Sequence, residues 1–253
     1  MKIITYNING IRAVLKKDFV AWCKAAKPDV LCLQEVKALE SQVDLSAFQD
    51  LGYHIYWHAA ERKGYSGVAV FSKIKPKHIE VGCGENIYDA EGRVLRVDFE
   101  KFAVLTTYMP SGSSSEERQF FKLDWLSFFK DYTKKLLRKH PNLIINGDFN
   151  VCHQPIDIHN PIANWNTPGF TQEERDWFTA YLKLGLVDGF RNFTSAPHHY
   201  SWWSYRAGAR KKNLGWRIDY QLFSKEMQPL IKRCVHLTEA MHSDHCPVLL
   251  ELN

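Results

Sequence analysis

With 253 residues, 45% of them hydrophobic and 13% aromatic, the chain can bury the core of one large α/β domain or of two small ones. The formal net charge of +5 permits a polyanionic partner without requiring one. An apolar stretch of about 18 residues, a signal peptide and a transit peptide are absent, which predicts a cytoplasmic protein without membrane attachment.

The first part of the chain consists mainly of short apolar runs that are typical of strands. Lys2–Ile8 predicts a strand, and Asp18–Ala26 predicts a helix that ends at Lys27-Pro28 because proline cannot continue it. Val30–Leu33 is a continuous apolar run, typical of a strand covered on both faces, and Gln34-Glu35 follow it. Turns rich in glycine and proline separate four further predicted strands, Tyr53–His58, Gly67–Ser72, Val94–Phe99 and Phe102–Tyr108.

The second part adds two helices and the remaining strands. Glu116–His140 is expected to be helical, with a broad aromatic stripe that begins at Phe120. After the strand-like run Leu143–Asp148, a capping box at Thr171–Glu174 predicts a helix that ends near Leu184. Because no linker or repeat divides the chain, we expect a single α/β domain over residues 1–253, with two packed sheets and helices outside them. The closing strands are expected at Trp216–Ser224, Ile231–Leu237 and Val248–Leu252.

The cysteines are scattered and form no Cys-x-x-Cys pair or metal-type cluster. Several lie in apolar runs, so buried, reduced thiols are expected, as in a reducing compartment. The six residues are Cys23, Cys32, Cys83, Cys152, Cys234 and Cys246.

Polar side chains stand where many of the predicted strands end. Sheets place such residues on a common rim, where ligand sites form. Each has an ordinary structural alternative, for example a turn former for Asn7, a partner of Arg217 for Asp219, or a satisfied core histidine for His245. Their number nevertheless favours a site. The residues are Asn7, Glu35, Tyr108, Asp148, Asn150, Asp219, Asp244 and His245.

Oxygen donors without thiolates favour Mg²⁺, which takes one or two protein carboxylates, and Glu35 is the best single candidate ligand. A histidine held by a carboxylate, here His245 with Asp219 or Asp244, can stabilise charge on a phosphoryl oxygen or move a proton. The Asp148–Asn150 pair can orient and deprotonate a water. The predicted chemistry is metal-assisted phosphoester hydrolysis, since the sequence contains neither a nucleophile elbow nor a Gly-x-x-x-x-Gly-Lys phosphate loop.

Several segments match one family in register. On these residues the chain resembles the exonuclease III family of abasic-site (AP) endonucleases, within the endonuclease/exonuclease/phosphatase superfamily, from Lys2 to Leu252. The aspartate and histidine motifs are shared across that superfamily, whereas Gly215–Tyr220 and the tryptophans before it select the repair branch. The matching segments are Tyr6–Arg12, Leu33–Lys37, Gly64–Val68, Tyr108–Pro110, Asn146–Asn150, Gly215–Tyr220 and Ser243–Pro247.

The resemblance implies a four-layered α/β sandwich of two mixed β-sheets and a DNA-repair hydrolase. It implies Mg²⁺-dependent cleavage on the 5′ side of abasic sites, with Mn²⁺ as a substitute, together with 3′-phosphodiesterase, 3′-phosphatase and 3′→5′ exonuclease activity. The implied partner is double-stranded DNA with abasic or blocked 3′ ends. The protein is then expected to be a monomer, associated with the nucleoid if it is bacterial.

The family's site residues carry over by position. Asp148 is expected to activate the attacking water, Asn150 to orient it, and Asp219 to hold His245 against the scissile phosphate. Tyr108 is expected to contact that phosphate or assist the leaving group. Glu35 is the main expected metal ligand, and the full metal set is Asn7, Glu35, Asp148, Asn150, Asp244 and His245.

The segment His198–Asn213 interleaves aromatic and basic residues, which can stack on a sugar or base while the cations follow phosphates. By resemblance, Trp202 and Trp216 line a pocket for the abasic sugar, Trp203 belongs to the core, and Arg206 inserts into the helix gap. The structural alternative is a loop packed by its aromatics with a solvated basic tip. Further expected DNA contacts are Lys37, Tyr65, Arg93, Arg118 and Asn164.

Three positions depart from the family pattern. Ser111 stands where the family often has Asn or Gln, which puts a phosphate contact in doubt, and Val36 replaces a more usual Thr. Ser113–Ser115 lacks an arginine that some members use to grip the opposite strand, so lower duplex affinity or product retention is expected.

Two alternative functions are kept. A superfamily phosphodiesterase with a different substrate would not need Gly215–Tyr220 or the Trp202 loop. A non-catalytic DNA-damage-binding protein would have lost the candidate ligands, all of which this chain retains.

Overall fold

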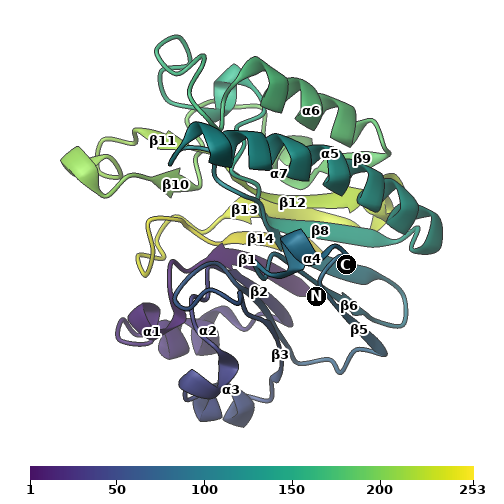
Figure 1. Cartoon of the computed structure of the whole chain (residues 1–253). Coiled ribbons are helices and arrows are strands. Elements are labelled where there is room, and N and C mark those ends of the chain that lie inside the picture. The colour runs from purple at the N-terminus through teal and green to yellow at the C-terminus, as the bar shows by residue number, and fades with distance from the viewer.

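Two six-stranded sheets lie at the centre of the structure, and helices cover the outer face of each (Figure 1). The computed structural model describes residues 1–253. From edge to edge, the first sheet contains β13 (Ile231–His236), β14 (Val248–Leu252), β1 (Lys2–Asn7), β2 (Val30–Gln34), β4 (Val68–Ser72) and β3 (His54–His58). The second contains β5 (His78–Val81), β6 (Val94–Asp98), β7 (Ala103–Tyr108), β8 (Leu143–Asp148), β12 (Asp219–Ser224) and β9 (Leu186–Asp188).

The helices form the two outer layers, which confirms the predicted four-layered α/β sandwich. Over the first sheet lie α1 (Ile11–Val14), α2 (Phe19–Ala26) and α3 (Ser46–Asp50), and over the second lie α5 (Glu116–Lys139) and α6 (Gln172–Leu182) (Figure 1). The short helices are α4 (Asn86–Asp89) and α7 (Gly189–Phe193). A small hairpin of β10 (Trp202–Trp203) and β11 (Gly215–Trp216) projects from one end of the sandwich.

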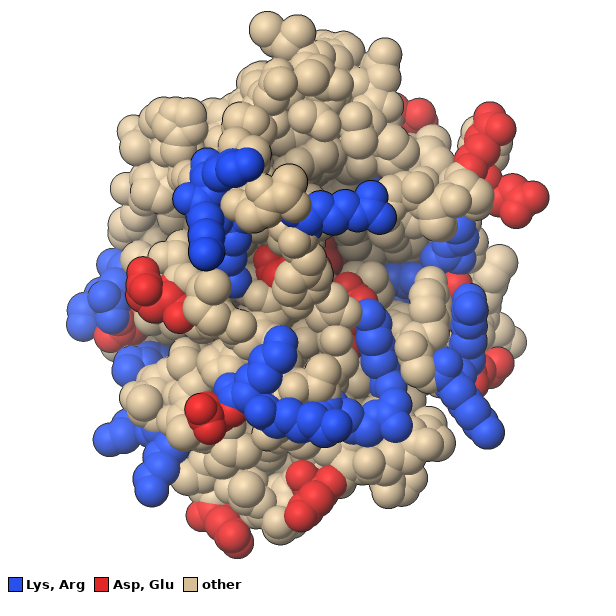
Figure 2. Space-filling model, turned by 90° about the vertical axis from the view of Figure 1, so that its left-hand side faces the viewer, with Lys and Arg blue, Asp and Glu red and all other residues tan.

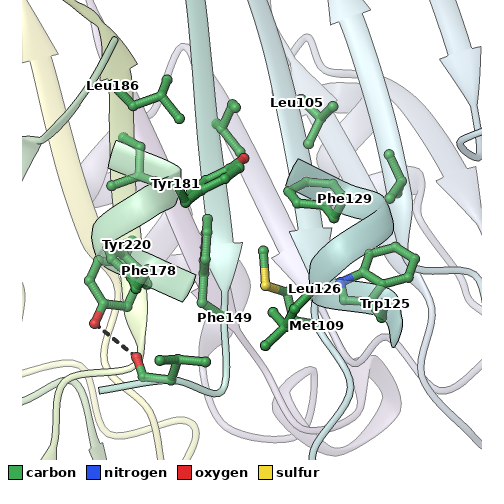
Figure 3. Close-up of a cluster of buried hydrophobic side chains, with 14 of the residues drawn as sticks. Leu105, Met109, Trp125, Leu126, Phe129, Phe149, Phe178, Tyr181, Leu186 and Tyr220 are labelled. Carbon is green, nitrogen blue, oxygen red and sulfur yellow. Dashed lines mark hydrogen bonds between the residues drawn. The ribbon is translucent and has the colours of Figure 1, made fainter. Parts of the chain in front are cut away.

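Apolar side chains fill each of the three spaces between the four layers. Phe129, Phe149 and Tyr181 belong to the cluster between the second sheet and its helices (Figure 3). Ile3 and Ile144 belong to the cluster between the two sheets, which draws on strands of both. The single domain expected over residues 1–253 requires such a shared core.

Local sequence explains where the two long helices begin. Ser115 caps α5 by accepting a hydrogen bond from the Arg118 backbone N–H, and the predicted capping box is formed at Thr171 and Glu174. The expected aromatic stripe is wrong at one position, because Phe120 is 59% exposed. At about 100° per residue it lies roughly opposite Phe129 on the helix and faces solvent.

One predicted strand is divided in the structure. The run Trp216–Ser224 is broken at Arg217 and Ile218, so that β11 pairs with β10 and β12 begins at Asp219. The reason is that the Arg217 backbone N–H donates to the Asp157 carbonyl oxygen, at 2.8 Å, instead of continuing the sheet. Strands β5 and β9 and the short helices were not predicted, since they are too short to carry a periodic pattern.

The cysteines agree with the expectation of reduced thiols. All six are free, and all except Cys83 are buried. No helix has the length and apolarity needed to cross a membrane.

Candidate active site

Strand register aligns three of the predicted residues across the second sheet. Tyr108 on β7 is the parallel partner of Asp148 on β8, and Asp148 is in turn the antiparallel partner of Asp219 on β12. Gly147 allows the close approach of β7 and β8, because a Cβ at this position would lie 1.9 Å from the Thr107 carbonyl oxygen. The glycine before Asp148 is therefore required by packing between strands.

The first sheet contributes two further residues to the same rim. β1 and β2 are parallel, so Asn7 at the end of β1 lies beside the end of β2, where Glu35 follows. Glu35 and Asn150 both adopt left-handed backbone conformations, with φ of 53° and 51°, which are uncommon for residues other than glycine. Such strained backbone conformations often occur at functional sites. Here they occur just after the ends of β2 and β8, at two residues that line the same cavity.

Asp148 is the centre of the polar cluster and is only 1% exposed. Its Oδ1 accepts the Asn150 backbone N–H at 2.9 Å, and its Oδ2 accepts the Asn7 side-chain amide at 2.8 Å. The same Asn7 Nδ2 donates to Glu35 Oε1 at 2.8 Å. Asn7 thus holds the two carboxylates together from opposite sheets.

His245 is oriented by Asp219. Its Nδ1 lies 2.9 Å from Asp219 Oδ2, and its Nε2 faces Asp148 Oδ2 at 3.9 Å. Ser201 donates its hydroxyl to the same Asp219 oxygen at 2.6 Å and accepts the Asp219 backbone N–H. The structure therefore assembles a line of side chains, Ser201–Asp219–His245–Asp148, that ends at the predicted water-activating carboxylate.

Burial and neighbouring charges shift the pKa values of His245 and Asp148. Burial alone would lower the pKa of His245, but Asp219, Asp148 and Asp244 outweigh it and raise the pKa above the ordinary value. Burial also raises the pKa of Asp148, and the nearby Asp219 and Glu35 add to this, whereas His245 opposes it. A cationic imidazole is thus held beside a carboxyl group that takes up a proton easily.

Three of the residues predicted to hold a metal form one compact group. Ligand atoms of Glu35, Asp148 and His245 lie within 4.8 Å of one another. Oxygen-rich donors of this kind suit a hard divalent cation. Asn7 points its amide NH₂ at Glu35 and Asp148, while its Oδ1 accepts the Asn9 backbone N–H at 3.0 Å, so its carbonyl is not directed at the cluster.

Two other predicted ligands also make different contacts. Asp244 accepts hydrogen bonds from Asn9 Nδ2 and Trp202 Nε1, both at 3.0 Å, and is not part of the compact group. Asn150 uses its side-chain Nδ2 to donate to the Met109 carbonyl oxygen at 2.9 Å. Both residues line the cavity in front of the cluster.

This cavity has a volume of about 310 Å³ and opens directly onto the polar cluster. Trp202 and Trp216 are cross-strand partners on β10 and β11, and their rings meet edge to face with centroids 6.1 Å apart. Trp203 is buried, as expected for a core residue. The lining residues are Glu35, Tyr108, Ser111, Ser113, Asp148, Asn150, Thr167, Pro168, Gly169, Trp202, Trp216, Ile218, Asp244 and His245.

The predicted DNA contacts Tyr65, Arg93 and Arg118 form one group beside Tyr108. Tyr65 Oη accepts hydrogen bonds from Arg93 at 2.9 Å and Arg118 at 3.1 Å, and Glu91 pairs with both arginines. Arg93 is only 1% exposed and also donates to the Tyr108 carbonyl oxygen at 2.7 Å, so its guanidinium is engaged within the protein. Arg118, with a side chain 27% exposed, remains accessible.

The remaining predicted contacts lie at the edges of the site. Lys37 Nζ is 2.7 Å from Glu35 Oε2 and donates to Asn9. Asn164 uses its amide to donate to the carbonyl oxygens of His159 and Asn160 within its own loop. Arg206 is exposed at the tip of the β10–β11 hairpin. Figure 2 shows this face, with acidic atoms in a central hollow and basic side chains above and below it.

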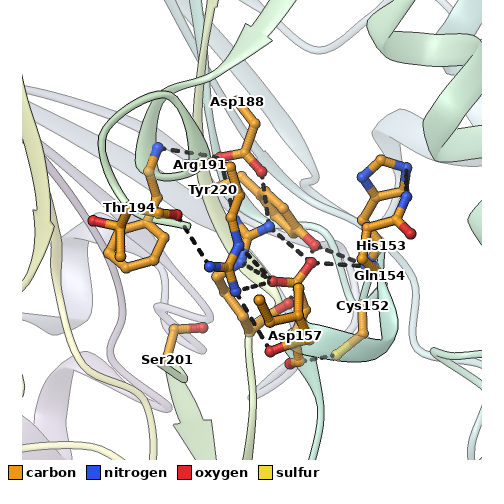
Figure 4. A network of polar contacts seen from close by, with 12 residues as sticks. Cys152, His153, Gln154, Asp157, Asp188, Arg191, Thr194, Ser201 and Tyr220 are labelled. Carbon is orange, nitrogen blue, oxygen red and sulfur yellow. Dashed lines mark hydrogen bonds and ion pairs between the residues drawn. The ribbon is translucent and has the colours of Figure 1, made fainter. Parts of the chain in front are cut away.

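A buried ion-pair network holds the hairpin to the second sheet (Figure 4). Arg217 is fully buried and pairs with Asp157 at 2.8 Å and with Asp188 at 2.7 Å, and Arg191 shares Asp157. The Arg217 guanidinium also stacks over the Tyr220 ring, 4.5 Å from its centroid. Because Arg217 lies between Trp216 and Asp219, the network fixes both the cavity wall and the histidine's carboxylate.

Some residues of the site were missed in the sequence. Ser201 lies within the aromatic segment, and no sequence motif marks Ser201, Thr167, Pro168 or Gly169 as part of the site. A lone serine carries no pattern that distinguishes it from a loop residue. The flanking tryptophans were the only available signal.

Comparisons with known proteins agree with this geometry. The family described as Endonuclease/Exonuclease/phosphatase family matches residues 4–245. An exodeoxyribonuclease of Bacillus subtilis is 45% identical over 255 residues, covering 100% of both chains. An AP endonuclease structure from Archaeoglobus fulgidus superimposes with a TM-score of 0.92 at 31% identity, covering 100% of this chain and 99% of that one.

A further solved structure contains DNA. The 3′ phosphatase NExo from Neisseria, bound to a product DNA hairpin, superimposes with a TM-score of 0.93 at 29% identity, covering 100% of this chain and 99% of that chain. The matches extend over the sheets, the hairpin and the polar cluster alike. The chain belongs to the endonuclease/exonuclease/phosphatase family.

Proposed function

We propose that this protein is a DNA-repair hydrolase that cleaves the phosphodiester on the 5′ side of abasic sites in duplex DNA. One observation carries the proposal. The Asp148–His245 cluster opens into a cavity of about 310 Å³ that is walled by Trp202 and Trp216. The similarity to an exodeoxyribonuclease, an AP endonuclease and a 3′ phosphatase bound to DNA supports both the reaction class and the substrate.

The residues of the cluster divide the chemistry. Asp148, oriented by the Asn150 N–H and by Asn7, orients and deprotonates the attacking water. His245, held cationic by Asp219, lies where negative charge develops on the phosphoryl oxygens. Burial, with Glu35 and Asp148 nearby, raises the pKa of Tyr108 well above its usual value, so its hydroxyl keeps its proton and can donate to the phosphate or the leaving oxygen.

Mg²⁺ is the proposed cofactor, with Mn²⁺ as a substitute. Glu35 and Asp148, with His245 close by, supply the donors that would hold it. A bound divalent cation would neutralise charge on the phosphate. We propose Glu35 as the principal ligand. We propose that Asn7, which donates to both carboxylates, fixes the position of the Glu35 carboxylate relative to that of Asp148.

The two tryptophans account for the choice of an abasic nucleotide. A sugar without a base is cheaper to extrude than a paired nucleotide. The Trp202 and Trp216 rings give the otherwise polar cavity one apolar wall, against which the extruded sugar would pack. Blocked 3′ ends and terminal nucleotides present a phosphoester of the same kind at the end of a strand, so 3′-phosphatase, 3′-phosphodiesterase and 3′→5′ exonuclease activity are included in the proposal. The protein is further proposed to act as a monomer in the cytoplasm, associated with the nucleoid if it is bacterial.

A duplex with one tetrahydrofuran abasic analogue tests the proposal, incubated with Mg²⁺ or EDTA beside an intact duplex. The expected result is a single Mg²⁺-dependent nick 5′ to the analogue, which Asp148→Asn abolishes and the exposed control Asp50→Asn retains. Tight binding without a nick would indicate a damage-binding protein instead. Cleavage of the intact duplex at the same rate would indicate a phosphodiesterase of different specificity.

A further inference from the structure

A buried ion pair joins α5 and α6 behind the cavity. Lys122 Nζ lies 2.5 Å from Glu174 Oε1, and the two side chains are 1% and 0% exposed. Lysine and glutamate are among the residues least often buried in full. Lys122 lies on a helix whose other buried side chains are mainly apolar, so its charge calls for a specific explanation.

The contacts of this pair reach two segments that line the cavity. Lys122 Nζ also donates to the Asn150 carbonyl oxygen at 2.7 Å. Glu174 Oε2 accepts the Gly169 backbone N–H at 2.7 Å and the Thr171 N–H at 3.0 Å. A continuous chain of hydrogen bonds therefore runs from Asn150 through Lys122 and Glu174 to Gly169.

Gly169 lies between Asn150 and a pocket tryptophan. A Cβ at position 169 would be 3.1 Å from the Asn150 carbonyl oxygen and 3.1 Å from Trp216 Cζ3. The Gly169 carbonyl oxygen accepts the Cys152 N–H at 2.7 Å, which ties the same two segments together a second time. The backbone of Asn150 and the cavity wall at Gly169 are thus in close contact, so a shift of one would move the other.

Stability alone is a weak reason for such a pair. Desolvating two charges offsets most of their attraction, and well-packed neutral side chains often serve the fold equally well. Apolar side chains could fill the same space, but they could not make directional hydrogen bonds to neighbouring segments. Here Lys122 reaches the Asn150 carbonyl oxygen and Glu174 reaches the Gly169 and Thr171 N–H groups, while Gln119 Nε2 also donates to Glu174 Oε1 at 3.1 Å.

We propose that Lys122 and Glu174 are positioning residues that set the distance between Asn150 and the Gly169 wall. They would thereby place the extruded sugar relative to the water that Asp148 activates. Neither residue touches the substrate or the metal ligands, and both act through Asn150 and Gly169. The inference rests on the proposed function, because it uses the roles assigned there to Asp148, Asn150 and Trp216.

The double variant Lys122→Met, Glu174→Gln tests this proposal. It removes both charges together, so no lone charge is left buried, and the amide oxygen at position 174 can still accept from Gly169 and cap α6. The bridge to Asn150 is lost, together with the hydrogen bond from Gln119 Nε2 to Glu174 Oε1. Leu136→Ala is the matched control, because Leu136 is buried on the same helix about 21 Å further along.

Three quantities are measured for each protein: melting temperature, affinity for abasic duplex in EDTA, and single-turnover nicking with Mg²⁺. For the double variant we expect nicking to slow about 10- to 100-fold, the effect of a misplacement near 1 Å, with affinity within about twofold. The Mg²⁺ concentration for half-maximal rate is expected to stay unchanged. Leu136→Ala is expected to lower the melting temperature while nicking at the wild-type rate.

Two results would overturn the inference while leaving the proposed function intact. One is a double variant that nicks at the wild-type rate. The other is a loss of rate in Leu136→Ala equal to that of the double variant, which would assign the effect to stability. A wild-type protein that fails to nick the abasic duplex would instead remove the proposed function itself.

Discussion

Trp202 donates its indole N–H to Asp244 at 3.0 Å, and Asp244 precedes His245 in the chain. A hydrogen bond therefore connects Trp202, in the wall of the cavity, to the loop that carries the His245 imidazole. Burial would raise the pKa of Asp244, but His245 and hydrogen bonds from Asn9 and Trp202 outweigh it and lower the pKa, so that this carboxylate stays ionised. The tryptophan proposed to recognise the substrate and the charged His245 are thus both held by the loop that contains Asp244.

Replacing this tryptophan separates stacking from the hydrogen bond. Trp202→Ala is expected to weaken binding of abasic duplex by about 1–3 kcal/mol, the range for one aromatic stacking partner. Trp202→Phe keeps the ring and should lose less. Fluorescence anisotropy in EDTA measures both, with intact duplex as the control. Equal losses on intact and abasic duplex would contradict a pocket role.

The Asp219–His245 pair predicts a shift in pH dependence. His245 has a raised pKa, so its charge is present at low pH and is lost as pH rises through that pKa. Asp219→Asn removes the main carboxylate partner and lowers the pKa, so the alkaline fall in nicking rate should move to lower pH. The maximal rate should drop about 10²- to 10⁴-fold, as when a histidine loses its orienting carboxylate. Single-turnover profiles from about pH 6 to 10 measure this, and an unmoved alkaline limb would contradict it.

The metal assignment predicts different effects for two carboxylates. Glu35→Ala should raise the Mg²⁺ concentration for half-maximal nicking about tenfold or more, because Glu35 belongs to the compact donor group. Asp244→Ala should raise it less, since Asp244 bonds to Asn9 and Trp202 instead. Metal titrations of the two variants decide between them. If Asp244→Ala raised the Mg²⁺ concentration for half-maximal nicking more than Glu35→Ala, the metal would have to be assigned to Asp244 instead.

Two arginines that were predicted to contact DNA, Arg206 and Arg93, differ in exposure and should behave differently. Arg206 is exposed at the hairpin tip, so Arg206→Ala should weaken binding and reduce the slope of log affinity against log salt by about one. Arg93→Ala should mainly destabilise the fold, because this side chain is 1% exposed and pairs with Glu91. Binding at several salt concentrations and thermal melting distinguish the two. A lowered salt slope in Arg93→Ala would show that it does meet phosphate.

The Arg217 network predicts acid sensitivity. Burial would raise the pKa of Asp157, but Arg217 and Arg191 outweigh it and lower the pKa to about 2. A lowered carboxyl pKa adds stability above the unfolded value near 4 that is lost as pH falls toward 2, here about 2 kcal/mol. Urea unfolding of wild type and Asp157→Asn between pH 7 and 3 measures this. The stability difference should shrink with falling pH, and a constant difference would contradict the assignment.

Much of the site could be predicted because its chemistry lies in local motifs. Asp148 follows an apolar run and a glycine, and Glu35 follows a strand buried on both faces, so each was placed at a strand end from the sequence alone. The capping box at Thr171 was equally local. The residues that were missed act over long distances along the chain. Ser201 became part of the site only through Asp219, and Lys122 only through Asn150 and Glu174.

The sequence by itself determined most of the longer strands, the two long helices and the identity of the chemical groups, because periodicity and capping are properties of neighbouring residues. It did not determine that Arg217 would break a strand, that Arg93 would be buried, or that Asn7 would turn its amide nitrogen toward Glu35 and Asp148. Those outcomes depend on which strands pair and which charges meet once the two sheets pack. Only the tertiary structure brings Asp148 to Asn7 across 141 positions of sequence.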